Sequence, residues 1–178
     1  MVIRELKYDD LESLLELFTQ SMTHAFLDEG LVSLRDDIIN EIIKKYQSAH
    51  KYLNEHDKCK IFLIAIINNE VVGSIEYRDL DKEITDNIKV NEDIKELGTI
   101  YIKPNYQGKR VASSLISEMI KRLIQQGIDQ FIIECGFKTA QKVWLHKFGK
   151  PYKIVKDYWS SGSDHYIWWV KNIKRYIH

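Results

Sequence analysis

The chain has 178 residues and a mass of 21.1 kDa, which fits one domain spanning residues 1–178 that is long enough to bury a core. Lysine plus arginine equals aspartate plus glutamate at 26 each, so no net charge attracts a polyanion, and we expect no nucleic-acid partner. The N-terminus lacks the apolar stretch of a signal peptide, and the longest apolar run, Ile61 to Ile67, is too short to cross a bilayer. We therefore expect a cytoplasmic protein without a membrane partner.

The two cysteines, Cys59 and Cys135, are far apart in the sequence and outside any metal-ligand spacing. We expect neither a disulfide nor a zinc site, and no metal cofactor. Both are interpreted as small apolar residues of the core.

In the N-terminal third, the spacing of apolar residues predicts a strand followed by two helices. Val2 to Lys7 alternates like a strand, and Asp9 with Glu12 resembles the capping box of a first helix. Ser33 with Asp36 then opens a second helix, whose apolar residues recur at helical spacing.

A hairpin follows these helices. Ile61 to Ile67 is apolar throughout, as expected of a strand covered on both faces. Asn68 and Asn69 provide a two-residue turn into a second strand, Val71 to Tyr77. Residues 78 to 95 form a polar stretch without a clear period.

Residues Ile100 to Gln126 combine a short apolar strand, a basic turn and an amphipathic helix that ends at Gly127. A helix that starts directly after a strand leaves its first N–H groups unpaired and directs its positive dipole end at the turn, which suits a phosphate or pyrophosphate. The residues expected to form this anion site are Gln107, Gly108, Lys109, Arg110, Val111, Ala112 and Ser113.

The C-terminal part adds a strand, a helix and a hairpin. Phe131 to Cys135 is a strand, Ala140 to Phe148 a helix stopped by Gly149, and Tyr152 to Trp159 with His165 to Val170 a closing hairpin. The predicted order is β-α-α-β-β-β-α-β-α-β-β. This indicates an α/β (α+β) chain with a mixed central sheet of about seven strands and about four helices.

The same region resembles the acyl-CoA signature of the GNAT N-acetyltransferase superfamily, whose core reads Q/R-x-x-G-x-G/A after a strand that ends near a proline. The residues that carry this resemblance are Ile100, Ile102, Pro104, Tyr106, Gln107, Gly108 and Ala112. The predicted element order is also the GNAT order over essentially the whole chain. The resemblance implies acetyl-CoA as cosubstrate and direct acetyl transfer to a primary amine of a small molecule or peptide.

One residue departs from the signature. The fourth position of the core, usually glycine, is Arg110. We expect a negative φ there, because a left-handed φ at a residue with a Cβ costs roughly 1–2 kcal/mol. The backbone amide of Arg110, and not its side chain, is then expected to bind the pyrophosphate.

The resemblance also implies catalytic positions. The backbone of Ile100 maps to the group that binds the thioester carbonyl, and that of Ile102 to the group that binds the pantetheine arm. Glu96, eleven residues before Gln107, is similar in position to the catalytic glutamate of the histone-acetyltransferase branch, and burial in an apolar cleft is expected to raise its pKa. Glu134 is the alternative base, which fits only with a bulge.

The general acid of the family is missing. Aligned on Lys147 and Gly149, the family's tyrosine falls on Leu145, and an accompanying asparagine falls on Lys138. Other candidate proton donors are Tyr152, Tyr158, Tyr166, His146 and His165. This departure leaves open an alternative function, a non-catalytic acyl-CoA-binding or partner-binding module on the same fold.

Substrate preference is weakly indicated. Residues 78 to 96 carry seven acidic and four basic side chains, which would attract a cationic amine if this segment borders the site. The aromatic tail, Tyr158 to Trp159 and Tyr166 to Trp169, is interpreted first as core, with a substrate wall or a homodimer surface as alternatives.

Overall fold

The fold is known from a computed structural model that describes residues 1–31, 33–55, 57–90 and 93–177. Its strands are β1 (Val2–Glu5), β2 (Ile61–Ile67), β3 (Glu70–Arg78), β4 (Glu96–Ile102), β5 (Gln130–Cys135), β6 (Lys153–Ser160) and β7 (Ser163–Lys171). Its α-helices are α1 (Leu11–Asp28), α2 (Arg35–Glu55), α3 (Lys82–Thr85), α4 (Val111–Gln125) and α5 (Lys138–Phe148). The predicted order is confirmed, with the one-turn helix α3 added inside the polar stretch.

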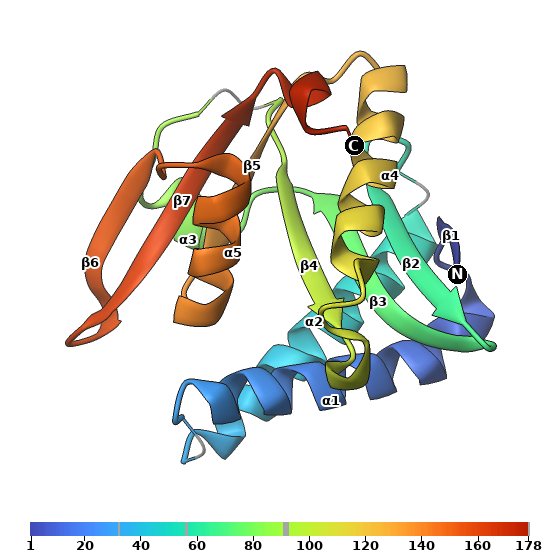
Figure 1. The fold of residues 1–178 in the computed structure, drawn as a ribbon, viewed down its shortest axis with the longest axis horizontal. Coiled ribbons are helices and arrows are strands. Elements are labelled where there is room, and N and C mark those ends of the chain that lie inside the picture. The colour runs from blue at the N-terminus through green and yellow to red at the C-terminus, as the bar shows by residue number, and fades with distance from the viewer. Residues whose placement is uncertain (32, 56, 91–92, 178) are drawn as a thin grey trace.

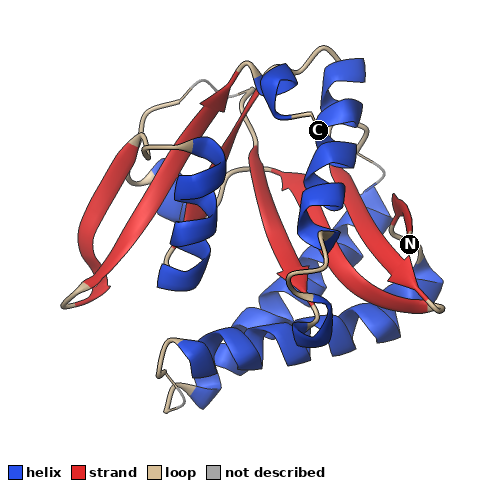
Figure 2. Cartoon of the chain, in the orientation of Figure 1, coloured by secondary structure: helices blue, strands red, loops and turns tan. Residues whose placement is uncertain are grey.

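The seven strands form one mixed sheet in the order β1-β2-β3-β4-β5-β7-β6. Only β4 and β5 pair in parallel, and all other neighbours are antiparallel. Figures 1 and 2 show α4 and α5 in front of the sheet and α1 and α2 on the opposite side. The predicted fold class, a mixed α/β sheet with helices, is confirmed.

Separate apolar cores fill the two faces. On the face of α4 and α5, alternate strand residues such as Leu63, Phe131 and Trp168 pack around Leu115 of α4. On the other face the remaining residues of the central strands meet α1 and α2, and a smaller cluster lies under α3. Because β2 contributes to both large cores, its uninterrupted apolar sequence is explained as predicted.

Of the turn and cap residues predicted from the sequence, the hairpin turn is confirmed and the helix cap is not. Asn68 and Asn69 have φ values of 51° and 63°, as a two-residue hairpin turn requires. The predicted Asp9 cap is wrong. The N-cap residue of α1 is Asp10, whose side chain does not cap this helix. Its Oδ2 instead accepts the Lys7 N–H at 2.9 Å across a preceding 3-10 turn, and Arg4 binds both oxygens of the carboxylate.

The backbone prediction for Arg110 is also wrong, because its φ is 63°. The turn from β4 to α4 contains two left-handed residues, Gly108 at 72° and Arg110. Glycine adopts this conformation freely, whereas Arg110 carries backbone strain of roughly 1–2 kcal/mol. The predicted negative φ would have avoided this strain.

The interpretation of the cysteines holds for one of them. Cys135 is buried in the core on the α5 side, whereas Cys59 is exposed in the turn after α2. The turn explains Cys59, because its N–H donates to Asp57 Oδ1 at 2.8 Å and leaves the side chain outside the core. Among the described residues, no helix has both the length and the apolar character needed to span a bilayer.

Gly73 of β3 lets α4 approach the sheet. A Cβ at this position would lie 2.8 Å from Ile102 Cδ1 and 3.0 Å from both Leu115 Cδ1 and Val111 Cγ1. We expect Gly73→Ala to lower the free energy of unfolding by about 1–3 kcal/mol, measured by urea denaturation. In a Leu115→Ala background the same change should cost clearly less, because the added methyl then has room. Wild-type stability of Gly73→Ala would contradict this packing.

Candidate functional site

Strands β4 and β5 separate after a single register pair. Glu96 pairs with Ile132, whose N–H donates to Lys95 O at 3.0 Å, and the described residues beyond this point show no further pairing of the two strands. Figure 1 shows β4 and β5 diverging from there. Lys103 N–H donates to Val72 O of β3, so strand alternation directs the N–H groups of Ile102 and Ile100 toward the β5 side.

A β-bulge in β4 bends the strand at this point. The register with β3 shifts between Ser74 and Glu76, and Thr99 has a φ of 52°, which is an outlier for a β-branched residue. Thr99 Oγ1 donates to Glu76 Oε2 at 2.7 Å, and Ser74 Oγ donates to Thr99 O at 2.8 Å. From α2, Ser48 Oγ donates to the other oxygen of Glu76 at 2.8 Å. A buried carboxylate thus holds the strained backbone in place.

The turn at the far end of β4 presents free backbone donors. Residues 107–110 are exposed, and Arg110 makes no side-chain cap at the start of α4, so the first N–H groups of the helix are available to an anion. Lys109 Nζ lies 5.3 Å from the centre of the Tyr106 ring. The structure therefore places the residues predicted for the anion site, 107–113, directly after Ile100 and Ile102. The side chain of Val111 is buried in the core, so of this residue only the backbone can face an anion at the turn.

The opposite end of β4 carries an acidic cluster, which consists of the buried Glu96 and the partly buried Asp81 and Glu134. Their carboxylate oxygens lie within 4.8 Å of one another. Glu96 is 1% exposed, forms an ion pair with Arg78, and accepts the Asp81 N–H at 2.7 Å. Arg78 also contacts Asp81 at 2.6 Å, so one guanidinium holds two members of the cluster.

The environment shifts the pKa values of this cluster in opposite directions. Burial raises the pKa of Glu96 to about 8, and the charges of Glu134 and Asp81 add to the effect against the attraction of Arg78. The pKa of Asp81 is lowered well below its usual range, because hydrogen bonding and attraction to Arg78 outweigh burial. Near neutral pH Glu96, and not Asp81, is therefore the carboxyl group that can exchange a proton.

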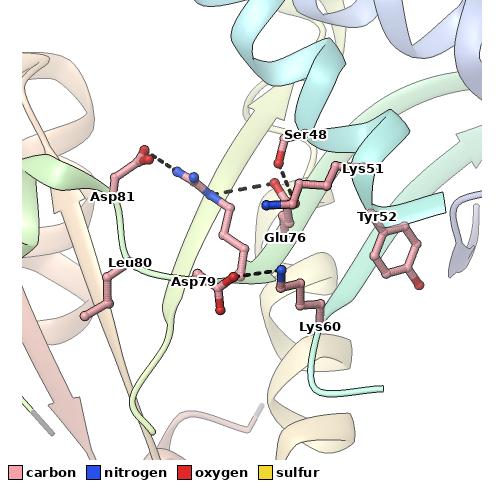
Figure 3. Close-up of a pocket in the computed structure, with 9 residues that line it drawn as sticks. Ser48, Lys51, Tyr52, Lys60, Glu76, Asp79, Leu80 and Asp81 are labelled. Carbon is pink, nitrogen blue, oxygen red and sulfur yellow. Dashed lines mark hydrogen bonds and ion pairs between the residues drawn. The ribbon is translucent and has the colours of Figure 1, made fainter. Parts of the chain in front are cut away.

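A cavity of about 190 Å³ lies between α2 and the end of β3, on the α2 side of Arg78. Figure 3 shows Glu76, Ser48 and Asp81 among its lining residues, with their contacts dashed. Lys60 Nζ lies 2.7 Å from Asp79 Oδ2 at one edge of the cavity. The cavity therefore borders the buried network that fixes both the bulge and Glu96.

Glu134, the alternative base, lies on β5 beside a fully buried histidine. Its Oε2 is 2.9 Å from His165 Nε2 of β7. Both residues were identified from the sequence, but in separate roles, and their pairing was not expected. β5 needs no bulge to direct Glu134 into the cluster, since its register with β7 is continuous from Gln130 to Cys135.

The other candidate proton donors lie at the surface or pack on aromatic rings. Leu145, at the position of the family tyrosine, is 40% exposed, and His146 is exposed in the last turn of α5. The ring of Tyr152 packs on Trp169, and that of Tyr166 on Trp168. Tyr158 is exposed, with its ring centre 5.0 Å from that of His165.

The interpretation of the aromatic tail as core holds for Trp168, which is 2% exposed, but not for Tyr158 and Trp159, which lie at the surface. Glu76, Arg78, Asp81 and Thr99 were not predicted as residues of the site. The acidic excess of residues 78 to 96 was the available signal for this part of the site.

Comparison with known proteins places this geometry in a family. The sequence matches the model of the Acetyltransferase (GNAT) family over residues 11–149. It is 28% identical over 138 residues to a spermidine N(1)-acetyltransferase of Thermoplasma acidophilum, covering 75% of this chain and 74% of that protein.

Solved structures agree with this match. The PaiA N-acetyltransferase of Thermoplasma acidophilum, in complex with coenzyme A, has a TM-score of 0.68 at 26% identity, over 96% of this chain and 98% of the other. A ribosomal-protein-alanine N-acetyltransferase of Brucella melitensis, at 18% identity, shares the fold with a TM-score of 0.67 over 96% and 99% of the two chains. The chain therefore belongs to the acetyltransferase (GNAT) family, whose enzymes use acetyl-CoA as the acetyl donor.

Proposed function

We propose that this N-acetyltransferase transfers the acetyl group of acetyl-CoA directly to a primary amine of a small cationic molecule or peptide, with Glu96 as the proton acceptor. The observation that carries the proposal is the arrangement of β4. An anion-binding turn follows its C-terminal end, unpaired N–H groups line its middle, and a carboxylate with a raised pKa marks its start.

The proposed cofactor contacts follow from this arrangement. The N–H groups of residues 108–113 bind the pyrophosphate, since the Gln107 N–H already donates to Pro104 O, and Lys109 and Arg110 add charge from exposed positions. Ile102 N–H binds the pantetheine arm, and Ile100 N–H binds the thioester oxygen, where negative charge develops during transfer. Bound acetyl-CoA supplies the electrophilic thioester carbon.

The acidic cluster favours a cationic acceptor. Arg78 is the guanidinium among Asp81, Glu96 and Glu134, and the ion pairs of Lys44 and Lys45 with this cluster go to Asp81 alone. Among the described ion pairs Glu134 contacts only His165, so an ammonium next to it would pair with its carboxylate. The relative named spermidine N(1)-acetyltransferase supports a polyamine as the first acceptor to test.

Glu96 removes the proton that the ammonium must lose before it can attack. In the balanced reaction a C–N bond forms, the C–S bond breaks, and the released sulfur leaves as a thiol after receiving a proton. Cys135 is not a nucleophile in this scheme, because burial raises the pKa of its thiol far above neutrality and keeps it protonated. The transfer therefore needs no covalent enzyme intermediate.

The test is thiol release from acetyl-CoA with a panel of polyamines, aminoglycosides and peptides. We expect release with polycationic amines above the rate without an acceptor, and no acetyl label on Cys135. If calorimetry detects CoA binding while no amine increases thiol release, the alternative of a non-catalytic acyl-CoA-binding module, suggested by Leu145, is favoured instead. Absence of CoA binding would reject both functions.

The left-handed backbone of Arg110 leads to a prediction for CoA affinity. If the backbone amide binds pyrophosphate, Arg110→Ala should weaken CoA binding by about 1 kcal/mol or less, the contribution of one exposed charge. Arg110→Gly should bind similarly and unfold at higher denaturant, because glycine accepts a φ of 63° without strain.

Arg110→Pro is the opposing variant. Proline cannot adopt a positive φ and lacks the N–H, so CoA affinity should fall by at least about 1.5–3 kcal/mol. Calorimetric dissociation constants at fixed salt, with circular dichroism as the folding control, compare the three variants. Equal losses for alanine and proline would identify the side chain as the anchor and reject the backbone site.

The raised pKa of Glu96 leads to a pH prediction. Glu96 must be ionised to accept a proton, so kcat/KM should fall as the pH drops through about 8. In Glu96→Gln we expect kcat/KM to be lower by about 100-fold or more, and its fall below about pH 8 to disappear. In the wild type and in Glu96→Gln alike, kcat/KM should still depend on deprotonation of the free amine near pH 10. A limb near 8 that persists in Glu96→Gln would assign the base to another residue.

A further inference from the structure

His165 is a fully buried histidine with partners on both sides of its ring. On one side, Nε2 lies 2.9 Å from Glu134 Oε2. On the other side, Nδ1 accepts a hydrogen bond from Trp159 Nε1 at 3.2 Å. The three side chains come from β7, β5 and β6, and the chain of contacts leads from the protein surface to the acidic cluster.

The tryptophan determines which nitrogen of His165 carries the proton. An indole N–H can only donate, so Nδ1 must accept and carries no hydrogen. An imidazolium would set two donors against each other at this contact. The state that satisfies this contact is a neutral ring with its single proton on Nε2. Nε2 is buried and makes no hydrogen bond in this structure, although Glu134 Oε2 lies 2.9 Å away.

The fold holds Trp159 for this contact. The register of β6 with β7 shifts between Val155 and Ser160, and Asp157 within this irregular segment has a φ of 51°. The indole lies directly over Gly136, where a Cβ would come within 2.5 Å of Nε1. Trp159 is 56% exposed, yet its N–H is directed inward to His165. Its place on an edge strand is thus explained by a polar contact.

We propose that Trp159 and His165 are positioning residues for Glu134. The indole fixes the neutral Nε2–H tautomer, and the 2.9 Å approach of Nε2 to Glu134 Oε2 holds this carboxylate beside Asp81 and Glu96 without adding a positive charge. The Glu134 carboxylate then receives the ammonium of the acceptor. The role of Glu134 rests on the proposed function, whereas the tautomer does not.

The tautomer is measured directly by ring ¹⁵N NMR of His165. The wild type should show an unprotonated Nδ1 and a protonated Nε2. Trp159→Phe retains the ring but removes the donor, and should lose this preference. A protonated Nδ1 in the wild type, or a spectrum unchanged in Trp159→Phe, would overturn the proposal whether or not the protein acetylates an amine.

The positioning role is tested by steady-state kinetics with a dicationic amine. Trp159→Phe and His165→Asn should raise KM for the amine about 10-fold, with kcat changed much less and CoA affinity unchanged. His165→Gln, which keeps an N–H near the position of Nε2, should recover most of the loss. Trp169→Phe is the matched control, because it removes an indole N–H that donates to Gln130 Oε1 and not to His165.

A double-mutant cycle separates positioning from general damage to the hairpin. In a Glu134→Gln background, Trp159→Phe should raise KM little further, since the carboxylate that it orients is already gone. Fully additive losses would assign Trp159 a merely structural role and reject the proposal. If the wild type releases no thiol with any amine, the proposed function fails, and the tautomer measurement alone decides the arrangement of His165.

Discussion

The bulge at Thr99 is the constraint on which the rest of the site depends. A β-branched residue at a positive φ persists only where its surroundings hold it, and here the buried carboxylate of Glu76 accepts hydrogen bonds from both Thr99 and Ser48. A bulge bends a strand and increases its twist. β4 thus parts from β5 immediately after Glu96, and its middle N–H groups have no β5 partner.

The same network arranges charge around Arg78. This guanidinium lies between Glu96 and Asp81, with Nε 3.7 Å from Glu76, so it ties the bulge to the acidic cluster. Breaking such a buried pair by removing one partner typically costs about 3–5 kcal/mol, because the remaining charge is left uncompensated. Burial nevertheless raises the pKa of Glu96, so a group that is fixed structurally also stays able to exchange a proton.

Much of the fold and part of the site could be predicted from the sequence. Period and turn residues located every strand, and the Gln107-Gly108 turn marked the start of α4, because these signals are local. The positive φ of Arg110 and the bulge at Thr99 were missed, since tertiary contacts impose them against intrinsic preference. The pairing of Glu134 with His165 was also missed, because it joins strands 31 residues apart in sequence through a register that only the folded sheet defines.

The central claim is that the anion-binding turn and the acidic cluster serve one site along β4. A crystal structure with bound CoA tests it most directly. We expect pyrophosphate oxygens within hydrogen-bond distance of the first N–H groups of α4. We expect the CoA sulfur beside Ile100, in the split between β4 and β5, facing Glu96 and Glu134. A pyrophosphate bound elsewhere, for example in the groove of about 860 Å³ beside β1 and the end of α4, would contradict it.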